Sequence, residues 1–226
     1  VLQKAITQGK VPSMILWGPP GVGKTTLANI IAKASNSTYY QLSAISSGVK
    51  ELREVIEEAK EQSSAILFID EIHRFNKGQQ DALLGAVEKG VITLIGATTE
   101  NPSFEVNSAL LSRCQVFVLK ALDKKDLGKL VAQAIEKDPL FSQHKIEIKE
   151  TEALFQLSGG DGRKLLNLLE LSVETLIGTS KDNETLVLTN DWVMEVAQTN
   201  IALYDKNGEQ HYDIISAFIK IGRAHV

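Results

Sequence analysis

A glycine-rich segment that ends in a lysine and two threonines carries the clearest chemistry in this sequence. Residues 18–26 read GPPGVGKTT and fit the pattern G-x-x-x-x-G-K-[ST], in which backbone N–H groups converge on phosphate oxygens. In this pattern Lys24 reaches the β- and γ-phosphates of a nucleoside triphosphate, and Thr25 holds Mg²⁺. The predicted phosphate site therefore consists of Gly18, Pro19, Pro20, Gly21, Val22, Gly23, Lys24, Thr25 and Thr26.

The residues on either side of this segment support the prediction. Four apolar residues, 14–17, precede it and are typical of a short buried strand. After it, apolar residues recur at helical spacing from Leu27 to Ala34, so the segment leads into a helix N-terminus, whose partial positive charge favours an anion. The alternative is a glycine-rich turn before an ordinary helix, and the strand and helix in the right places favour the phosphate loop.

Two adjacent acids, Asp70 and Glu71, form a second candidate site. They follow a short apolar run, 65–69, of the kind that forms a central parallel strand buried on both faces. We expect Asp70 to orient Mg²⁺ through water and Glu71 to act as the general base that polarises the attacking water. Two such acids could also cap a helix or lie in a loop. Their place one strand and one helix after the phosphate loop favours catalysis and predicts a strand inserted between the two motif strands.

Composition sets the class of protein. The chain has 226 residues, a net charge of −4 and 43% hydrophobic residues, which suits one large domain or two small ones. There is no apolar run of membrane-spanning length, and no signal peptide is recognisable, so we expect no membrane partner and a cytoplasmic setting. Cys114 is the single cysteine, which excludes a disulfide framework, and we interpret it as a small core residue. The mildly acidic balance gives no global case for nucleic-acid binding.

The order of the predicted elements indicates the fold class. Strands and helices alternate up to residue 119, which predicts an α/β fold with a five-stranded parallel sheet and helices on both faces. From Asp123, which can cap a helix, only helices are expected, so an all-helical lid domain follows the sheet. After the strands at 14–17 and 65–71, the predicted strands are 39–42, 91–97 and 115–119, and the predicted helices are 49–62, 79–88, 152–157, 163–177, 191–198 and 211–220.

Four segments follow from this order. We predict an N-terminally truncated nucleotide-binding domain at 1–120, a helical lid at 121–182, the start of a C-terminal helical or oligomerisation region at 183–220, and a non-native tail at 221–226. Val1 is not an initiator, and residues 220–226 match the translation of a short-read sequencing adapter. A genuine, poorly patterned tail is the alternative.

The motifs together resemble the AAA+ ATPase family. GPPGVGKT, ILFIDE, IGATTENPSF, LLSRC and GGDGRKLLNLLE occur in that family's order and at its spacing. The chain is most similar to the clamp-loader-like branch. Within that branch, IGATTENPSFEVNSALLSRC and YDKNGEQHYDIISAFIK resemble the replication-associated recombination ATPases, the RarA/MgsA group. The resemblance covers residues 1–220.

The resemblance implies roles for three more residues. Thr99 occupies the sensor-1 position, where a hydroxyl can hold the attacking water or the γ-phosphate, and nearby Asn101 is the weaker candidate. Arg113 matches an arginine that the family offers to the nucleotide of a neighbouring subunit. Arg163 matches sensor 2, which reaches from the lid to the γ-phosphate of its own subunit. His73 is interpreted as a structural neighbour of the acids.

The resemblance also implies a function. It implies an Mg²⁺-dependent, DNA-stimulated ATPase that acts on DNA at stalled or gapped replication forks, assembles as a homo-oligomer, a tetramer at full length, and associates with the bacterial nucleoid. The implied partners are fork, gap or single-strand/duplex junction DNA and single-strand-binding protein. A clamp-loader subunit and a RuvB-type branch-migration ATPase are the alternatives. A nucleotide-dead structural subunit is disfavoured because Lys24, Asp70, Glu71 and Arg113 are all present.

Overall fold

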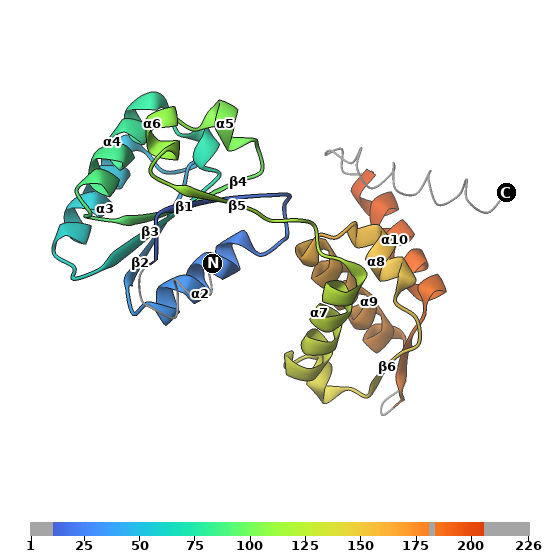
Figure 1. The fold of residues 1–226 in the computed structure, drawn as a ribbon. Coiled ribbons are helices and arrows are strands. Elements are labelled where there is room, and N and C mark those ends of the chain that lie inside the picture. The colour runs from blue at the N-terminus through green and yellow to red at the C-terminus, as the bar shows by residue number, and fades with distance from the viewer. Residues whose placement is uncertain (1–10, 181–183, 206–226) are drawn as a thin grey trace. The chain divides into compact units, whose positions relative to one another are not determined.

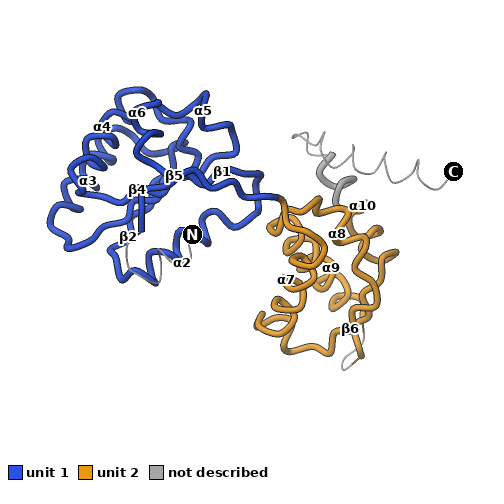
Figure 2. The backbone as a smooth tube through the Cα atoms, viewed as in Figure 1, with its two compact units in different colours: residues 1–120 blue, residues 121–226 orange. Residues whose placement is uncertain are grey.

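The protein consists of two compact units, residues 1–120 and residues 121–226 (Figure 2). The structure is a computed structural model and describes residues 11–180 and 184–205. The helix expected at 211–220 and the tail at 221–226 lie outside these residues. Among the described residues, no helix combines the length and the apolar character that crossing a bilayer requires.

Unit 1 (residues 1–120) is built on a five-stranded parallel sheet (Figure 1). The spatial order of the strands is β2-β3-β4-β1-β5, so β4 lies between β1 and β3. The predicted five-stranded parallel sheet and the strand inserted between the two motif strands are thereby confirmed. The strands are β1 (Met14–Trp17), β2 (Thr38–Ser43), β3 (Ala65–Asp70), β4 (Thr93–Thr98) and β5 (Gln115–Val118).

Helices cover both faces of this sheet, as predicted (Figure 1). Alternate residues of a strand point to opposite faces. Accordingly Met14 and Leu16 pack with α2 (Lys24–Ala34), whereas Ile15 belongs to the cluster that contains α3 (Val49–Lys60) and α4 (Lys77–Glu88). Burial on both faces explains why the central strands β1 and β3 are almost continuously apolar.

Local hydrogen bonds explain two differences from the predicted boundaries. Helix α4 begins at Lys77 rather than at residue 79, because Asn76 and Gln79 form a reciprocal capping box. Strand β4 begins at Thr93 rather than at residue 91. The N–H of Val91 donates to Ala86 O at 3.0 Å and that of Gly90 to Val87 O at 3.0 Å, a Schellman motif that binds residues 90 and 91 to the end of α4.

Short elements link β3 to β4 and β4 to β5. A 3₁₀ turn, η1 (Ile72–Arg74), follows β3 immediately and precedes α4. The polar segment expected after β4 contains α5 (Pro102–Glu105), and α6 (Ser108–Leu111) leads into β5. The candidate site lies at the ends of β3 and β4, where η1 and α5 follow the strands.

Unit 2 (residues 121–226) is mainly helical (Figure 1). The carboxylate of Asp123 accepts a hydrogen bond from the N–H of Asp126 at 2.8 Å, which confirms the predicted helix cap. A parallel pair of three-residue strands, β6 and β7, adds to the expected helices. The elements are α7 (Lys124–Lys137), η2 (Phe141–Gln143), β6 (Ile146–Ile148), α8 (Glu152–Ser158), α9 (Gly162–Thr179), β7 (Leu186–Leu188) and α10 (Asn190–Asp205).

One apolar core joins the elements of unit 2. Leu127 of α7, Leu154 of α8 and Leu165 of α9 are buried in the same cluster as Leu188 of β7 and Val193 of α10. Residues on both sides of position 182 therefore share this core. The predicted division of the chain at residues 182 and 183 stays a prediction.

Candidate functional site

The carboxyl ends of three adjacent strands bring the predicted motifs of unit 1 to one edge of the sheet. Strand β1 ends at Trp17, which pairs with Thr98 at the end of β4, and β4 in turn pairs with β3, which ends at Asp70. The phosphate loop follows β1, Thr99 follows β4, and Glu71 follows β3. Ligands of open α/β sheets bind at this edge.

The phosphate loop leads into the N-terminus of α2, where no side chain caps the backbone N–H groups. Gly23 is the N-cap residue, with φ at 88°, a left-handed conformation that a Cβ atom would strain. No side chain caps α2, and its first turn holds no acidic residue. The backbone N–H groups at this terminus are therefore suited to an anion.

Lys24 lies folded against the loop that precedes it. Its Nζ donates to Gly18 O at 2.7 Å and to Pro19 O at 2.9 Å, and only 8% of the residue is exposed. The loop therefore holds the ammonium group beside its own backbone. Gly18 is closely packed as well, since a Cβ atom there would stand 2.2 Å from Leu119 O.

The two acids after β3 have distinct surroundings. The carboxylate of Asp70 accepts a hydrogen bond from the N–H of Glu71 at 3.1 Å. Glu71 has φ at 53°, which is uncommon for a residue with a side chain. Its Oε2 accepts a hydrogen bond from Thr99 Oγ1 at 3.4 Å and lies 3.3 Å from His73 Nδ1. The structure thus brings together Glu71 and Thr99, two of the three predicted catalytic residues.

Two residues near Glu71 complete a small polar network. His73 Nδ1 lies 3.0 Å from the hydroxyl of Thr98, a residue that is fully buried. The sequence predicts a structural role for His73 and makes no prediction for Thr98. Adjacent threonines at a strand end were the available signal, because alternate residues there face different neighbours.

Asn101, the weaker sensor-1 candidate, caps a short helix. Its side-chain oxygen accepts a hydrogen bond from the N–H of Ser103 at 3.0 Å and so caps the short helix α5. Thr99 is the one of these two residues that contacts Glu71 in the described structure.

Arg113 contacts the ends of α4 and α6 in its own unit. Its Nη2 forms an ion pair with Glu88 Oε1 at the end of α4, and its Nη1 donates to Ala109 O at 2.8 Å and to Ser112 Oγ at 3.1 Å. The Arg113 side chain remains 42% exposed. A guanidinium has five N–H donors, and these three acceptors leave donors for a further ligand. Glu88 is a partner that the sequence analysis missed, because 25 residues separate it from Arg113.

Arg163 belongs to unit 2 and is exposed in the first turn of α9. A cation near a helix N-terminus is normally disfavoured. Here the carboxylate of Asp161 accepts hydrogen bonds from the N–H groups of Arg163 at 2.8 Å and Lys164 at 3.0 Å. The negative cap offsets the unfavourable interaction, so the local structure accounts for a cation at this position. The sensor-2 role of Arg163 stays a prediction.

Burial raises the pKa of two side chains in unit 1, those of Tyr39 and Cys114. Burial and, to a smaller extent, the charge of Asp70 raise the pKa of Tyr39 to about 12. The Tyr39 ring also stacks on Phe68, with ring centroids 6.4 Å apart. Burial raises the pKa of Cys114 to about 11, and Cys114 packs against the core of unit 1. A thiol of this kind agrees with a core residue rather than a nucleophile.

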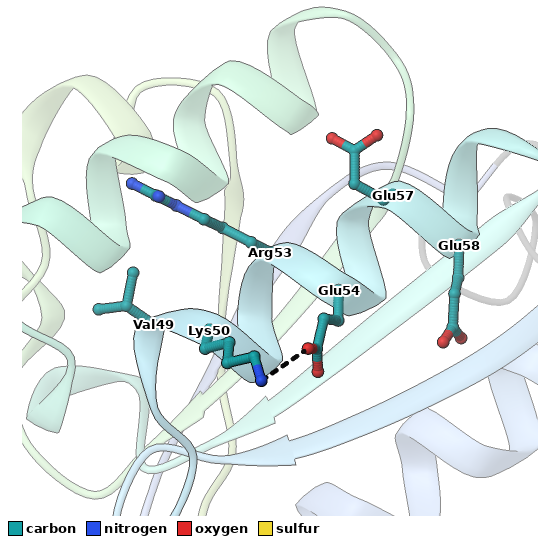
Figure 3. A pocket seen from close by; sticks show the side chains of 6 residues that line it. All are labelled: Val49, Lys50, Arg53, Glu54, Glu57 and Glu58. Carbon is teal, nitrogen blue, oxygen red and sulfur yellow. Dashed lines mark ion pairs between the residues drawn. The ribbon is translucent and has the colours of Figure 1, made fainter.

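A hollow of about 610 Å³ runs along the outer face of α3 (Figure 3). All its lining residues come from that helix, and Lys50 and Glu54 form an ion pair at 3.6 Å within it. This agrees with a solvated, charged helix face. Its lining residues are Val49, Lys50, Arg53, Glu54, Glu57 and Glu58, none of which belongs to the strand ends described above.

The residues at the sheet edge fit a metal–nucleotide complex better than a bare metal ion. Among the described residues, no group of three or more His, Cys, Asp and Glu side chains is arranged to hold a metal. Thr25 and Asp70 offer a hydroxyl and a carboxylate, which are oxygen donors of the kind Mg²⁺ prefers. Mg²⁺ is commonly held by one or two protein ligands together with substrate phosphates. The donor set therefore fits Mg²⁺ bound with a nucleotide.

Two family models match this chain. Residues 14–122 match the model described as ATPase family associated with various cellular activities (AAA), and residues 142–223 match the model described as AAA C-terminal domain. The first match contains the phosphate loop, both acids, Thr99 and Arg113, and the second contains Arg163.

Curated relatives and solved structures agree with these matches. Replication-associated recombination protein A of Escherichia coli K12 is 46% identical over 97% of this chain and 50% of its own length, and that of Bacillus subtilis 168 is 38% identical over 97% and 52%. The chain thus spans about half the length of the curated relatives it matches. The Thermotoga maritima RuvB Holliday junction branch migration motor superposes with a TM-score of 0.71, at 27% identity over 88% of this chain and 65% of that one. This chain therefore belongs to the AAA family of ATPases, with an AAA C-terminal domain after its nucleotide-binding unit.

Proposed function

We propose that the full-length protein is a RarA-like motor that binds Mg·ATP and hydrolyses it at the strand-end edge of unit 1. The observation that carries this proposal is the placement of the phosphate loop, Asp70 and the Glu71–Thr99 pair at the ends of three adjacent strands. Sequence identity of 46% to a replication-associated recombination protein A supports the RarA-like assignment.

In this proposal, different residues of unit 1 bind the phosphates, bind the metal and activate the attacking water. The N-terminus of α2 and Lys24 bind the phosphates, and Thr25 and Asp70 would hold Mg²⁺. When bound, the metal neutralises charge on the β- and γ-phosphate oxygens. Glu71 accepts a proton from the attacking water through a carboxylate oxygen. Thr99, which contacts the Glu71 carboxylate, places its hydroxyl beside that water.

A second subunit completes the site in this proposal. The contacts of Arg113 are with Glu88 and the α6 segment, and its side chain is partly exposed, which supports a role directed outward to the nucleotide of a neighbour. An arginine supplied in this way stabilises the charge that develops during phosphoryl transfer. Arg163 reads the γ-phosphate from unit 2. We therefore infer a homo-oligomer, and the resemblance to the RarA/MgsA group implies a tetramer at full length.

DNA at stalled or gapped replication forks is the proposed effector, with single-strand-binding protein as a partner and the bacterial nucleoid as the setting. The relatives are named for replication-associated recombination, which supports a role on replicating DNA. The fork structures, the protein partner and the setting are what the family resemblance implies. A RuvB-type branch-migration motor is the second candidate, because RuvB structures share the fold at 27% identity. The higher identity to the recombination proteins favours the first candidate.

Paired variants of the full-length protein separate nucleotide binding from chemistry. Lys24→Ala removes the cation of the loop, so ATP binding measured by calorimetry should be lost. Glu71→Gln keeps the shape but removes the base, so ATP should still bind while turnover falls by roughly 10²-fold or more. Near-normal ATP affinity in the first variant, or near-normal turnover in the second, would contradict the assigned roles.

The DNA assignment has its own test. ATP turnover of the full-length protein should rise when forked or gapped DNA is added, and it should rise less with blunt duplex of the same length. A four-way junction serves as the comparison for the RuvB-type candidate. Stimulation by the four-way junction alone would favour that candidate over the RarA-like one.

A further inference from the structure

His73 lies where it can fix the carboxylate of Glu71. It belongs to η1, directly after Glu71 and β3, and its side chain is only 12% exposed. Its Nδ1 lies 3.3 Å from Glu71 Oε2 and 3.0 Å from Thr98 Oγ1. One ring nitrogen thus faces two oxygens, one from the end of each of two adjacent strands.

The hydrogen bonds around Thr98 favour a hydrogen on this nitrogen. A hydroxyl has one proton, and that of Thr98 is directed to Glu100 O at 3.2 Å, while its oxygen accepts from the N–H of Glu100 at 3.0 Å. An ionised carboxylate at Glu71 has no proton to donate. Both oxygens facing His73 can therefore act as acceptors, an arrangement that a hydrogen on Nδ1 satisfies.

We propose that His73 is a positioning residue that orients the Glu71 carboxylate through its Nδ1–H. The proposal rests on the proposed role of Glu71 as the base. The contact with His73 would also fix the carboxylate of Glu71, whose backbone is left-handed. The Nδ1–H is anchored on buried Thr98 and reaches Glu71 from one side, and the Thr99 hydroxyl reaches the same Oε2. The base is thereby tied to the ends of both β3 and β4.

The geometry sets the size of the expected effect. A distance of 3.3 Å from Nδ1 to Oε2 is at the long end for a hydrogen bond, and the proton is shared with Thr98. Losing this contact should loosen the carboxylate without removing it. Misplacing a reacting group by about 1 Å can cost about 10²-fold in rate, so we expect a smaller loss of roughly 10-fold in kcat. The KM for ATP should change little, because the contact is to the base.

A matched pair of variants tests the proposal in the full-length protein. The amide nitrogen of asparagine occupies nearly the place of Nδ1, whereas that of glutamine extends to the place of Nε2. His73→Asn should therefore retain most of kcat, and His73→Gln should lose roughly 10-fold. ATP affinity and thermal unfolding measured on the same samples show whether both variants are folded. Equal kcat in the two variants, or a larger loss in His73→Asn, overturns the proposal.

The two proposals fail in different ways. If Glu71→Gln abolishes turnover while both His73 variants match the unaltered protein, Glu71 remains the base and the positioning role of His73 is wrong. If Glu71→Gln itself turns over normally, the proposed function fails first.

A second measurement does not depend on any variant folding. Imidazole ¹⁵N NMR of the unaltered protein distinguishes a protonated Nδ1 from an unprotonated one. We expect the hydrogen on Nδ1 of His73. A lone pair on Nδ1 would overturn the proposal, because that nitrogen could not donate to Glu71.

Discussion

Replacing Glu71 by glycine and, separately, by alanine isolates the backbone free energy at this residue. Both variants lose the carboxylate and its contacts with Thr99 and His73, so their difference reports the conformation alone. Glu71 has φ at 53° and ψ at 44°, within the left-handed region. Strain of this kind is commonly found at functional sites.

The size of the difference follows from two opposing effects. A left-handed conformation costs about 1–2 kcal/mol for a residue with a Cβ atom. Glycine avoids that cost but loses more backbone entropy on folding, about 0.5–1 kcal/mol. We therefore expect Glu71→Gly to be more stable than Glu71→Ala by about 0.5–1 kcal/mol, a shift of roughly 1–4 °C in Tm for a chain of this size.

Denaturant and thermal unfolding of the two nucleotide-free variants measure this difference. Glu57, in the interior of α3 and exposed, provides a matched control. There the order should reverse, with alanine more stable than glycine by about 1 kcal/mol. If Glu71→Gly is less stable than Glu71→Ala while the Glu57 pair behaves as expected, the backbone at Glu71 is not strained and the reasoning is wrong.

Four further experiments test other parts of the structure. Arg163→Ala should leave Mg·ADP binding nearly unchanged and weaken the preference for ATP; equal weakening of both nucleotides in calorimetry would make Arg163 a structural residue. The Cys114 pKa is raised from 9.0 to about 11, so alkylation near neutral pH should be at least about 100-fold slower than in the unfolded chain, and an equal rate would refute its burial. Because the folded state keeps this proton longer, the contribution of Cys114 to stability is present below about pH 9 and declines as the pH rises towards 11; Cys114→Ala should remove this decline. Gly18→Ala places a methyl group against Leu119 O and should cost about 1–3 kcal/mol in urea unfolding; no loss would show that the loop start can move.

Much of unit 1 could be predicted because its signals are local. The apolar runs at β1 and β3 are buried on both faces, so their sequences carry little alternation and stand out as strands. The spacing of the two motifs indicated the inserted strand, which the structure identifies as β4. In unit 2, the N-cap at Asp123 was also recognisable, because capping needs one side chain within a few residues of the helix start.

What could not be predicted depends on contacts between distant residues or on backbone conformation. The ion pair of Arg113 with Glu88 and the approach of His73 to Thr98 exist because separate elements pack together. The left-handed backbone of Glu71 has no sequence signal, since that conformation normally favours glycine. Strands β6 and β7 have three residues each, too few for a period of two to be recognised.

The central claim is that ATP is hydrolysed at a site that a neighbouring subunit completes, and a mixing experiment tests it most directly. Full-length Lys24→Ala and full-length Arg113→Ala should each be inactive alone, since one lacks the loop cation and the other the outward arginine. After subunit exchange, some interfaces pair an intact loop with an intact Arg113, so ATP turnover should partly return. If labelling shows that subunits exchange and no turnover returns, the site is not completed by Arg113 of a neighbour.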